Sequence, residues 1–465
     1  MTLLDANQAA PRPAPPLRRR PSYLLALLLA ACGAGAPSGP PSTTATPTRA
    51  NTAGAESTTA STGSAASAAL PGRAPTPDEW LRLCEAFAAA ARETGLPWRS
   101  EPTVRIMTSQ AIGERLAAQL DEEDIVRLKA LYVTLGLLPA DYDVREAAVT
   151  LLSEQVLAFY DPKEKLLVVG EASGADGETQ QAHAEQLRLV LLHEAVHALQ
   201  DQHFDLQQLM ARAQERSVDA ANALRALVEG QAMLVSMRPA IRKALPHADA
   251  ATHDDTIAQA MGAIFRRWLG SSWRQMEGLP GIARSPTLGA APAIVRTPLL
   301  FGYLAGTAYA NVGARFGDPP TLAEPPTCTR RVVHPGPCPP PATLPDVPPP
   351  PGWRPVLQET LGWLESGVFL AHSLPRDLVD LRWAGDRLQL YEGPAGRHAV
   401  RWRLRYETEQ DATQAARLAE ATLASAGAEG LVRRAGREVW VAVGWPRTQA
   451  EGILRASLDA AGGER

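Results

Sequence analysis

The sequence has no excess of basic residues. Its 46 Lys and Arg residues are outnumbered by 50 Asp and Glu residues, which gives a formal net charge of -4 at pH 7. Proteins that bind nucleic acid usually carry a basic patch or stripe that neutralises phosphates. The composition therefore argues against nucleic acid as a partner.

Long apolar runs are also missing. The short apolar segment 24–31 follows three arginines at 18–20, and this order is typical of a secretory signal that is too short to span a bilayer permanently. The end of the segment, Leu-Ala-Ala-Cys at 29–32, resembles a bacterial lipobox, in which Cys32 is lipidated and becomes the first mature residue. We therefore expect residues 1–32 to be a lipoprotein signal peptide, with acyl chains on the cysteine holding the exported protein on a membrane.

Charge is almost absent from residues 33–75, which consist largely of Ala, Ser, Thr, Gly and Pro. Such a segment cannot bury a core, so it predicts a disordered spacer between the membrane and the folded body. Gly33 in place of an Asp favours the outer membrane, by resemblance to enterobacterial sorting. We expect an envelope protein whose body faces either the periplasm or the outside.

Cysteine is scarce, with four residues in a chain of 465. Export places the chain in an oxidising compartment, where disulfides persist. Cys328 and Cys338 lie close together in a Pro-rich loop, so this pair is the expected disulfide. Cys84 is then expected to be a buried free thiol on a helix, although sequence alone does not determine the pairing.

Elements of a folded body begin at Thr76-Pro77-Asp78-Glu79, which has the N-cap, the N1 proline and the capping-box Glu of a helix start. The segment 155–169 contains two β-rich runs around an Asp-Pro turn and predicts a hairpin. The apolar spacing further predicts helices at 78–94, 110–119, 121–136 and 143–153, and a strand at 103–107.

The pattern His193-Glu194-x-x-His197 lies on a helix predicted at about 181–202. The i, i+4 spacing puts two imidazoles one turn apart on one face, close enough to share a tetrahedral zinc ion. Glu194 then lies beside the metal without binding it, where it can take a proton from an activated water. Apart from the motif, positions 190–199 are uncharged, which suits a buried metal helix. The pattern predicts a zinc-dependent hydrolase with Glu194 as general base.

A third metal ligand is predicted at Glu229, on a helix over about 216–237. The flanking positions are apolar, and a lone carboxylate in an apolar stripe needs a partner, which a metal supplies. Glu229 follows His197 by 32 residues, enough for a loop and an antiparallel return helix, and two His with one Glu is a known catalytic zinc set. The alternative is an exposed Glu at the rim of a surface helix.

Two residues after the motif have open roles. His203 follows His197 by six residues, so on a continuous helix it points away from the metal, and we expect it to be structural. Asp201 follows His197 by four residues and lies on the same face. It is predicted either to accept a hydrogen bond from a ligand imidazole or to be a solvated residue of the last turn.

Zinc peptidases usually supply a second donor to the oxyanion from Tyr, His or Arg. Tyr303 and Tyr309 are candidates on an apolar helix at about 298–315, where tyrosines usually belong to the core. His334 lies in an irregular segment before a proline, a common setting for site residues. His334 is therefore the preferred candidate, with a plain loop histidine as the alternative.

The motif with Glu229 downstream resembles the gluzincin metallopeptidases, the thermolysin-like class. Over about 125–410 the chain also resembles a group of exported bacterial lipoproteins regarded as metallopeptidases. The resemblance implies zinc peptidase activity, with His193, His197 and Glu229 as ligands. Many thermolysin-like enzymes have an Asp four residues after the ligand Glu, whereas this chain has Met233, so the support for Glu229 stays unassigned. The matching segments are EQVLAFYDPKEKLLVV, LLHEAVHALQDQHFDL, ALVEGQA, PPTCTRRVVHP and RWAGDRLQLY.

The end of the chain predicts a small α+β module without a catalytic signature. Residues 356–372 are expected to be helical, and the helix at 409–425 is expected to pack on a sheet. The expected strands are 386–392, 397–406 and 437–444.

Together these patterns predict an α+β protein. A mostly helical zincin-like catalytic domain with a small edge β-hairpin spans 76–334, a Pro-rich linker spans 335–355, and a small α+β domain spans 356–465. The expected function is that of a membrane-anchored zinc peptidase with Zn²⁺ as cofactor and a peptide or protein as substrate. The hairpin either pairs with the substrate backbone by β-addition or is purely structural. The alternative function is a non-catalytic envelope lipoprotein that uses a peptidase-like scaffold for binding. The oligomeric state is left open.

Overall fold

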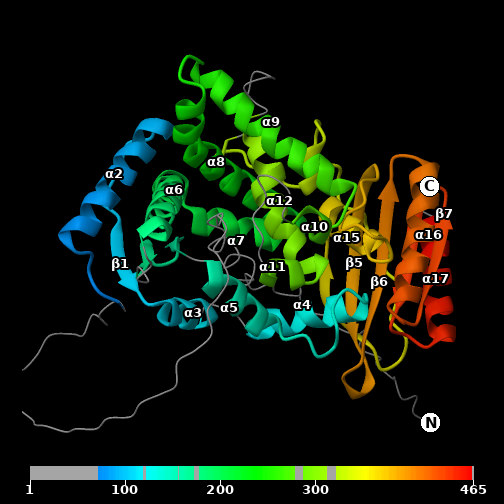
Figure 1. The fold of residues 1–465 in the computed structure, drawn as a ribbon. Helices are drawn as coiled ribbons and strands as arrows, with labels where there is room; N and C mark the ends of the chain where they lie inside the picture. Colours follow the sequence, from blue (N-terminus) through cyan, green and yellow to red (C-terminus); the bar gives the residue numbers. More distant parts are fainter. Residues whose placement is uncertain are drawn as a thin grey trace, which may run out of the picture.

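The computed structural model describes residues 72–118, 122–155, 157–171, 177–277, 286–311 and 321–462. Helices predominate, and they are joined by one sheet of three strands and one of five, so the predicted α+β class is confirmed (Figure 1). The predicted signal peptide, Cys32 and most of the predicted spacer lie outside the described residues. Among the helices described, none is both long enough and apolar enough to cross a bilayer.

The helices are α2 (Pro77–Thr94), α3 (Ser109–Ala118), α4 (Glu122–Thr134), α5 (Val144–Gln155), α6 (Gly177–Phe204), α7 (Leu206–Arg216), α8 (Val218–Ala244), α9 (Ala250–Leu269), α10 (Trp273–Met276), α11 (Pro286–Ala290), α12 (Ala293–Ala310), α14 (Thr329–Val333), α15 (Gly362–Ala371), α16 (Glu409–Ser425) and α17 (Arg447–Gly462). The strands are β1 (Thr103–Met107), β2 (Ala158–Asp161), β3 (Leu166–Gly170), β4 (Arg354–Glu359), β5 (Trp383–Glu392), β6 (His398–Tyr406), β7 (Gly430–Ala435) and β8 (Glu438–Val443).

Helix α2 starts with the predicted capping box. The Thr76 hydroxyl accepts from the Glu79 backbone N–H at 3.3 Å, and the Glu79 carboxylate accepts from the Thr76 N–H at 2.7 Å. The prediction that Cys84 is a buried thiol is wrong, because Cys84 is exposed. The helix turns a different face to the core, and the buried residues of α2 are Leu83, Ala86, Phe87 and Ala90.

The three-stranded sheet has the order β1-β3-β2 and lies beside α6 at one end of the molecule (Figure 1). Strand β1 is parallel to β3, and β2 pairs antiparallel with β3, which confirms the predicted hairpin. Strand β2 is therefore an edge strand of this sheet. Apolar side chains of α2, the sheet and α6 share one core, so the hairpin is held directly against the helix that carries the metal motif.

The five-stranded sheet at the other end of the molecule is antiparallel, with the order β4-β5-β6-β8-β7. Alternate residues of its strands face opposite sides, so one face packs against α15 and α16 and the other against α17. The expectation of a helix over 356–372 is wrong at its start. Residues 354–359 form the edge strand β4, and α15 begins only at Gly362, whose own backbone is left-handed (φ +77°).

The two predicted domains share one hydrophobic core, which runs from α4, α8 and α12 to α15, α16 and the five-stranded sheet. Asp219 at the start of α8 accepts from the backbone N–H and the hydroxyl of Thr329, at 2.8 and 2.6 Å. The Pro-rich segment 335–353 has no helix or strand but packs on the sheet, for example where Arg403 donates to the Thr343 carbonyl at 2.7 Å. The predicted Cys328–Cys338 disulfide is confirmed.

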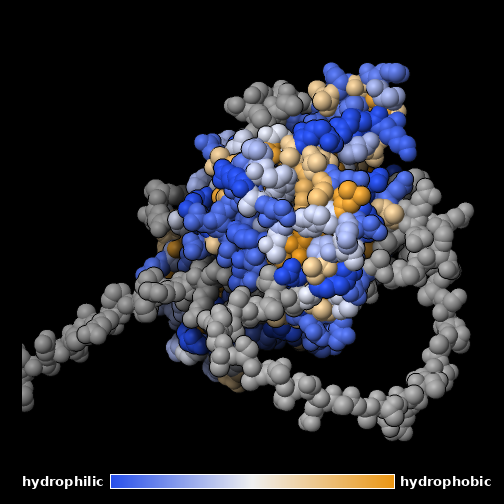
Figure 2. All heavy atoms as spheres, turned by 90° about the vertical axis from the view of Figure 1, so that its left-hand side faces the viewer, coloured by the Kyte–Doolittle hydropathy of each residue, from blue (hydrophilic) through white to orange (hydrophobic). Residues whose placement is uncertain are grey.

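Figure 2 shows the side of the molecule on which α2 lies, and the coloured residues there are mostly hydrophilic, with apolar residues in small patches. This agrees with the burial pattern of α2, in which only Leu83, Ala86, Phe87 and Ala90 are buried. The predicted metal ligands are buried inside the molecule, on α6 and α8.

Candidate metal centre

The structure brings together the three predicted metal ligands. His193 and His197 lie one turn apart on α6, and Glu229 reaches them from α8. The Nε2 atoms of the two imidazoles are 3.0 Å apart. The Glu229 Oε2 atom lies 3.1 Å from the first of these nitrogens and 3.5 Å from the second. Three potential donor atoms thus form one small triangle.

The dimensions of this triangle suit a zinc ion. Tetrahedral bonds of roughly 2.0–2.1 Å place neighbouring ligand atoms about 3.3–3.4 Å apart. The donor set of two imidazole nitrogens and one carboxylate oxygen is also one that zinc accepts. The second oxygen of Glu229, Oε1, is buried and has no hydrogen-bond partner among the residues that the structure describes, whereas buried carboxylate oxygens are normally paired. The residues present therefore fit the metal.

All three side chains are buried, and Glu229 is only 1% exposed. Burial acts to raise the pKa of Glu229, but the charge of His197 and the hydrogen bond from His193 outweigh it and lower the pKa to about 2. For His197, burial acts to lower the pKa, but the Glu229 charge prevails and raises it to about 9. Both pKa shifts come from the attraction between the Glu229 carboxylate and the His197 imidazolium, and a metal cation held by these donors would replace that proton.

Helix α12 packs closely against α8 beside Glu229. The crossing of α8 and α12 is so close that a Cβ atom added to Gly230 would lie 2.1 Å from the Gly306 carbonyl oxygen. A Cβ atom added to Gly302 would lie 3.5 Å from the Glu229 Cγ atom. Glycines at the crossing therefore let α12 cover the third ligand directly.

Arg225 places a positive charge near Glu229. The sequence left the support for Glu229 open, because Met233 stands where many thermolysin-like enzymes have an Asp. Arg225 lies one turn before Glu229 on α8 and is 1% exposed. Burial lowers the pKa of Arg225 to about 10, and the negative charge of Glu229 acts against that lowering. An Arg four residues before the ligand in an apolar helix was the signal that could have identified it.

Glu194 lies next to the ligands and is held by the edge strand. Its Oε2 atom accepts a hydrogen bond from the backbone N–H of Tyr160, on β2, at 2.8 Å. The residue is 3% exposed, and burial raises the pKa of Glu194 to about 8. A cation in the ligand triangle would act against this effect of burial and favour the ionised carboxylate.

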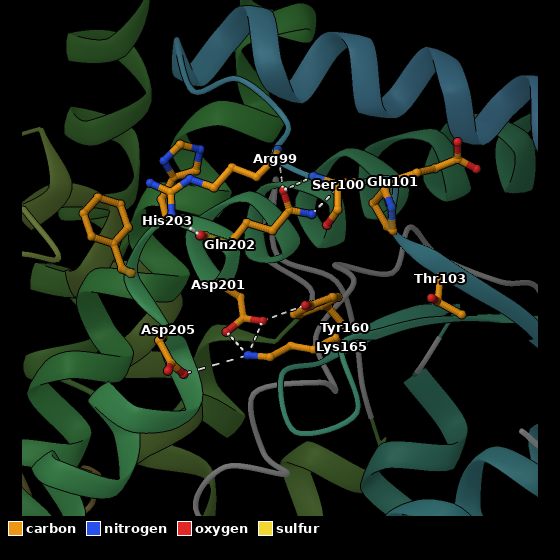
Figure 3. Close-up of a pocket in the computed structure, with 12 residues that line it drawn as sticks. Arg99, Ser100, Glu101, Thr103, Tyr160, Lys165, Asp201, Gln202, His203 and Asp205 are labelled. Carbon is orange, nitrogen blue, oxygen red and sulfur yellow. Dashed lines mark hydrogen bonds and ion pairs between the residues drawn. The ribbon is translucent and has the colours of Figure 1, made fainter. Parts of the chain in front are cut away.

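Both predictions for Asp201 are wrong, because it is neither solvated nor bonded to a ligand imidazole. Asp201 is 3% exposed, and its carboxylate accepts from the Tyr160 hydroxyl at 2.7 Å and from the Lys165 ammonium at 2.9 Å (Figure 3). The i+4 position faces the β2–β3 hairpin, where these two groups lie. The Nδ1 atom of His197 is paired instead with Gln200, at 2.9 Å.

A pocket of about 600 Å³ lies at the C-terminal end of α6, next to the hairpin (Figure 3). His203 lines it and is bonded to the Pro97 carbonyl oxygen at 2.8 Å, which agrees with its predicted structural role. The metal ligands do not line this pocket. It is lined by Arg99, Ser100, Glu101, Pro102, Thr103, Tyr160, Lys165, Asp201, Gln202, His203, Phe204 and Asp205.

Of the three candidates for the oxyanion donor, only Tyr303 lies beside the ligands. Its ring centroid is 6.2 Å from that of His193. The hydroxyl of Tyr309 is paired with Arg331. His334 Nε2 is bonded to Asp380 at 2.9 Å, and in the described part of the chain no hydrogen bond, ion pair or ring contact joins His334 to the ligands. The structure therefore does not bring the preferred candidate to the metal centre, and its catalytic role stays a prediction.

Sequence comparison adds one finding. The model of a protein family described as a domain of unknown function, DUF8575, matches residues 379–455, from just before β5 to within α17. This match covers part of the five-stranded sheet module and none of the residues of the metal centre. No curated protein and no solved structure matches the chain. The geometry of the metal centre is therefore the basis on which a function can be proposed.

Proposed function

We propose that the chain is a zinc-dependent peptidase in which His193, His197 and Glu229 hold Zn²⁺ and Glu194 is the general base. One observation carries the proposal. Three zinc-type donor atoms from two helices lie within 4.8 Å of one another, in a buried setting. The carboxylate of the general base, fixed by the edge strand, comes from the residue that follows the first ligand.

His193, His197 and Glu229 would hold the zinc ion, which would lower the pKa of a bound water towards about 7 and would polarise a carbonyl group. Glu194 takes the proton from the attacking water at Oε1, because Oε2 is engaged by the Tyr160 N–H. The same carboxyl group then passes the proton to the leaving nitrogen of the peptide bond. We assign the second donor to the developing oxyanion to the Tyr303 hydroxyl, because its ring lies beside His193.

The position of β2 supports a peptide substrate. In the described part of the chain β3 is the one strand beside β2, and on the opposite edge of β2 the Tyr160 N–H is bonded to Glu194. Extended peptides bind such edges by adding a strand through backbone hydrogen bonds. Substrate paired along β2 would present its backbone next to the general base.

The disulfide supports the proposal of an exported, lipid-anchored protein. Cys328 and Cys338 are bonded in the folded chain, and disulfides persist in oxidising compartments outside the cytosol. We propose that Cys32 provides the lipid anchor in the outer membrane. Mass spectrometry of the membrane-extracted protein tests this, and an unmodified Cys32 would contradict it.

The function is tested by metal content followed by cleavage. We expect one zinc ion per chain in the purified protein by elemental analysis, and none in the His197→Ala variant, because a tetrahedral site needs that ligand. A peptide library should be cleaved by the wild-type protein. Glu194→Gln should keep zinc and lose cleavage, since an amide cannot accept the proton.

Three results separate the alternatives. A wild-type protein without zinc would overturn the proposal. Stoichiometric zinc without cleavage of any library peptide would favour the non-catalytic envelope lipoprotein. A Glu194→Gln variant that cleaves at the wild-type rate would rule out this mechanism.

A further inference from the structure

The imidazole of His197 has a hydrogen-bond partner on the side away from the other ligands. Its Nδ1 atom lies 2.9 Å from Oε1 of Gln200, which follows it by three residues on α6. Gln200 is 3% exposed, so its amide depends on protein partners. The amide nitrogen has two acceptors on α8, the Val228 carbonyl at 3.2 Å and the Gln231 Oε1 atom at 3.0 Å.

These contacts determine how the Gln200 amide is oriented. A backbone carbonyl can only accept a hydrogen bond, so the amide nitrogen must face Val228 and the amide oxygen must face His197. An amide oxygen also only accepts, so Nδ1 of His197 must carry the hydrogen. In the neutral imidazole the lone pair is then on Nε2. Nε2 is the atom that lies in the ligand triangle, 3.0 Å from its counterpart on His193.

The same amide connects the two helices that carry the ligands. Val228 and Gln231 lie on either side of Glu229 on α8, and Gln200 is on the helix of the two histidines. A shift of α8 along α6 would break both hydrogen bonds that the Gln200 nitrogen donates. The residue therefore acts on the orientation of His197 and on the distance between His197 and Glu229.

We infer that Gln200 is a positioning residue of the metal centre, which holds His197 in the Nδ1–H tautomer and holds α6 in register with α8. This inference rests on the proposed zinc site, but it is independent of whether a peptide is cleaved. Groups that hold the second ring nitrogen of a ligand histidine usually contribute 10- to 100-fold to metal affinity.

The test is a zinc affinity measurement on the full chain by competition with a chromophoric chelator. Gln200→Leu removes the acceptor for Nδ1–H and both donors to α8, and we expect zinc affinity to fall about 10- to 100-fold. Gln200→Glu keeps an acceptor for Nδ1–H and loses the donors, so its affinity should fall less. Gln207→Leu, at an exposed position on α7, is the matched control and should bind zinc like the wild type.

Imidazole NMR provides a readout that a purely structural role would not move. In the zinc-loaded wild type, the His197 Nδ1–H should exchange slowly with solvent. In folded Gln200→Leu it should exchange faster, and in Gln200→Glu it should again be protected. Circular dichroism checks the fold of each variant, and if Gln200→Leu does not fold, the Gln200→Glu variant decides.

Wild-type zinc affinity in both Gln200 variants, or a His197 ring without a hydrogen on Nδ1, would overturn the inference. A wild-type chain that binds no zinc would overturn it together with the proposed function. Zinc binding that depends on Gln200 without any peptide cleavage would support the inference and contradict only the peptidase proposal.

Discussion

Tyr303 and His334 show how much the role of a single residue depends on its neighbours. Tyr303 lies on α12, next to the glycines at the α8 crossing, with its ring 6.2 Å from the His193 ring. His334 lies at the end of α14, where it pairs with Asp380 and packs against Trp363. Of these two rings, that of the tyrosine lies beside a metal ligand and that of the histidine does not.

Tyr303→Phe should lower kcat for peptide cleavage about 100- to 1000-fold, the usual effect of removing one oxyanion donor. The ring stays in place, so zinc content should not change. Steady-state kinetics and elemental analysis check both statements. Tyr309→Phe is the matched control, six residues later on the same helix, because its hydroxyl pairs with Arg331 instead.

The opposite result for Tyr303 would identify a different oxyanion donor. If Tyr303→Phe retained wild-type kcat while His334→Ala lost it, the donor would be the histidine that the sequence favours. The α14 segment would then have to move towards the ligands during the reaction.

At the scale of helices, the α8–α12 crossing decides where the third ligand lies. A Cβ atom on Gly306 would be 2.1 Å from the Ala226 carbonyl oxygen, and Gly230 meets the Gly306 carbonyl equally closely. A backbone carbonyl cannot move away from an added Cβ atom as the end of a flexible side chain can. The two helices would therefore have to separate, and α8 carries Glu229 one residue away from this contact.

Gly306→Ala should destabilise the fold by about 1–3 kcal/mol, the usual cost of overpacking a core, and should weaken zinc binding because α8 is displaced. Gly452→Ala is the control. Gly452 lies in α17, and a Cβ atom there meets nothing within 4 Å, so alanine should stabilise by roughly 0.4–1 kcal/mol. Urea unfolding of both variants checks the signs. Equal stability of Gly306→Ala and the wild type would show that the helices have room at this crossing.

At the scale of the whole molecule, buried carboxyl groups join the helical part to the sheet module. Glu365, on α15, is 1% exposed and accepts from the Tyr132 hydroxyl at 2.9 Å and from the Asn222 amide at 3.1 Å. Glu359, on β4, is also buried and accepts from the backbone N–H of Val218, on α8, at 3.1 Å. Because these carboxyl groups are buried between the helical part and the sheet module, their protonation affects the unfolding free energy of both parts together.

We expect the free energy of unfolding of the chain to fall as the pH rises from about 4.5 to 8. Burial raises the pKa of Glu365 to about 8, whereas the unfolded chain has a pKa near the ordinary value of about 4.3. Between these values the folded state holds a proton that the unfolded chain has released, so each increase in pH favours unfolding, and the loss is complete above pH 8. Burial also raises the pKa of Asp219 to about 7 and that of Asp386 to about 6, which adds to the same slope.

Glu365→Gln should flatten this decline, while Glu420→Gln, at an exposed position on α16, should leave it unchanged. Urea unfolding at pH 5, 6, 7, 8 and 9 measures the slope in each protein. A Glu365→Gln protein with the full wild-type slope would show that Glu365 is ionised in the folded state throughout this range.

The sequence by itself determined the features that depend on short spacing. The i, i+4 geometry of a helix places His193 and His197 together whatever the rest of the chain does. The Asp-Pro turn predicts the β2–β3 hairpin, and the short loop between Cys328 and Cys338 favours their disulfide. Even Glu229 could be predicted, because a single carboxylate in an apolar helix needs a partner.

The tertiary structure alone decided which groups meet these residues. Gln200 and Asp201 are neighbours on α6, but Asp201 bonds to the hairpin, whereas the amide nitrogen of Gln200 bonds to α8, because the two positions face different elements. Strand β4 forms because β5 offers it an edge, a pairing between segments about 30 residues apart that no local pattern encodes. Spacing along one helix is a property of its backbone, whereas contacts between elements depend on the packing of the whole core.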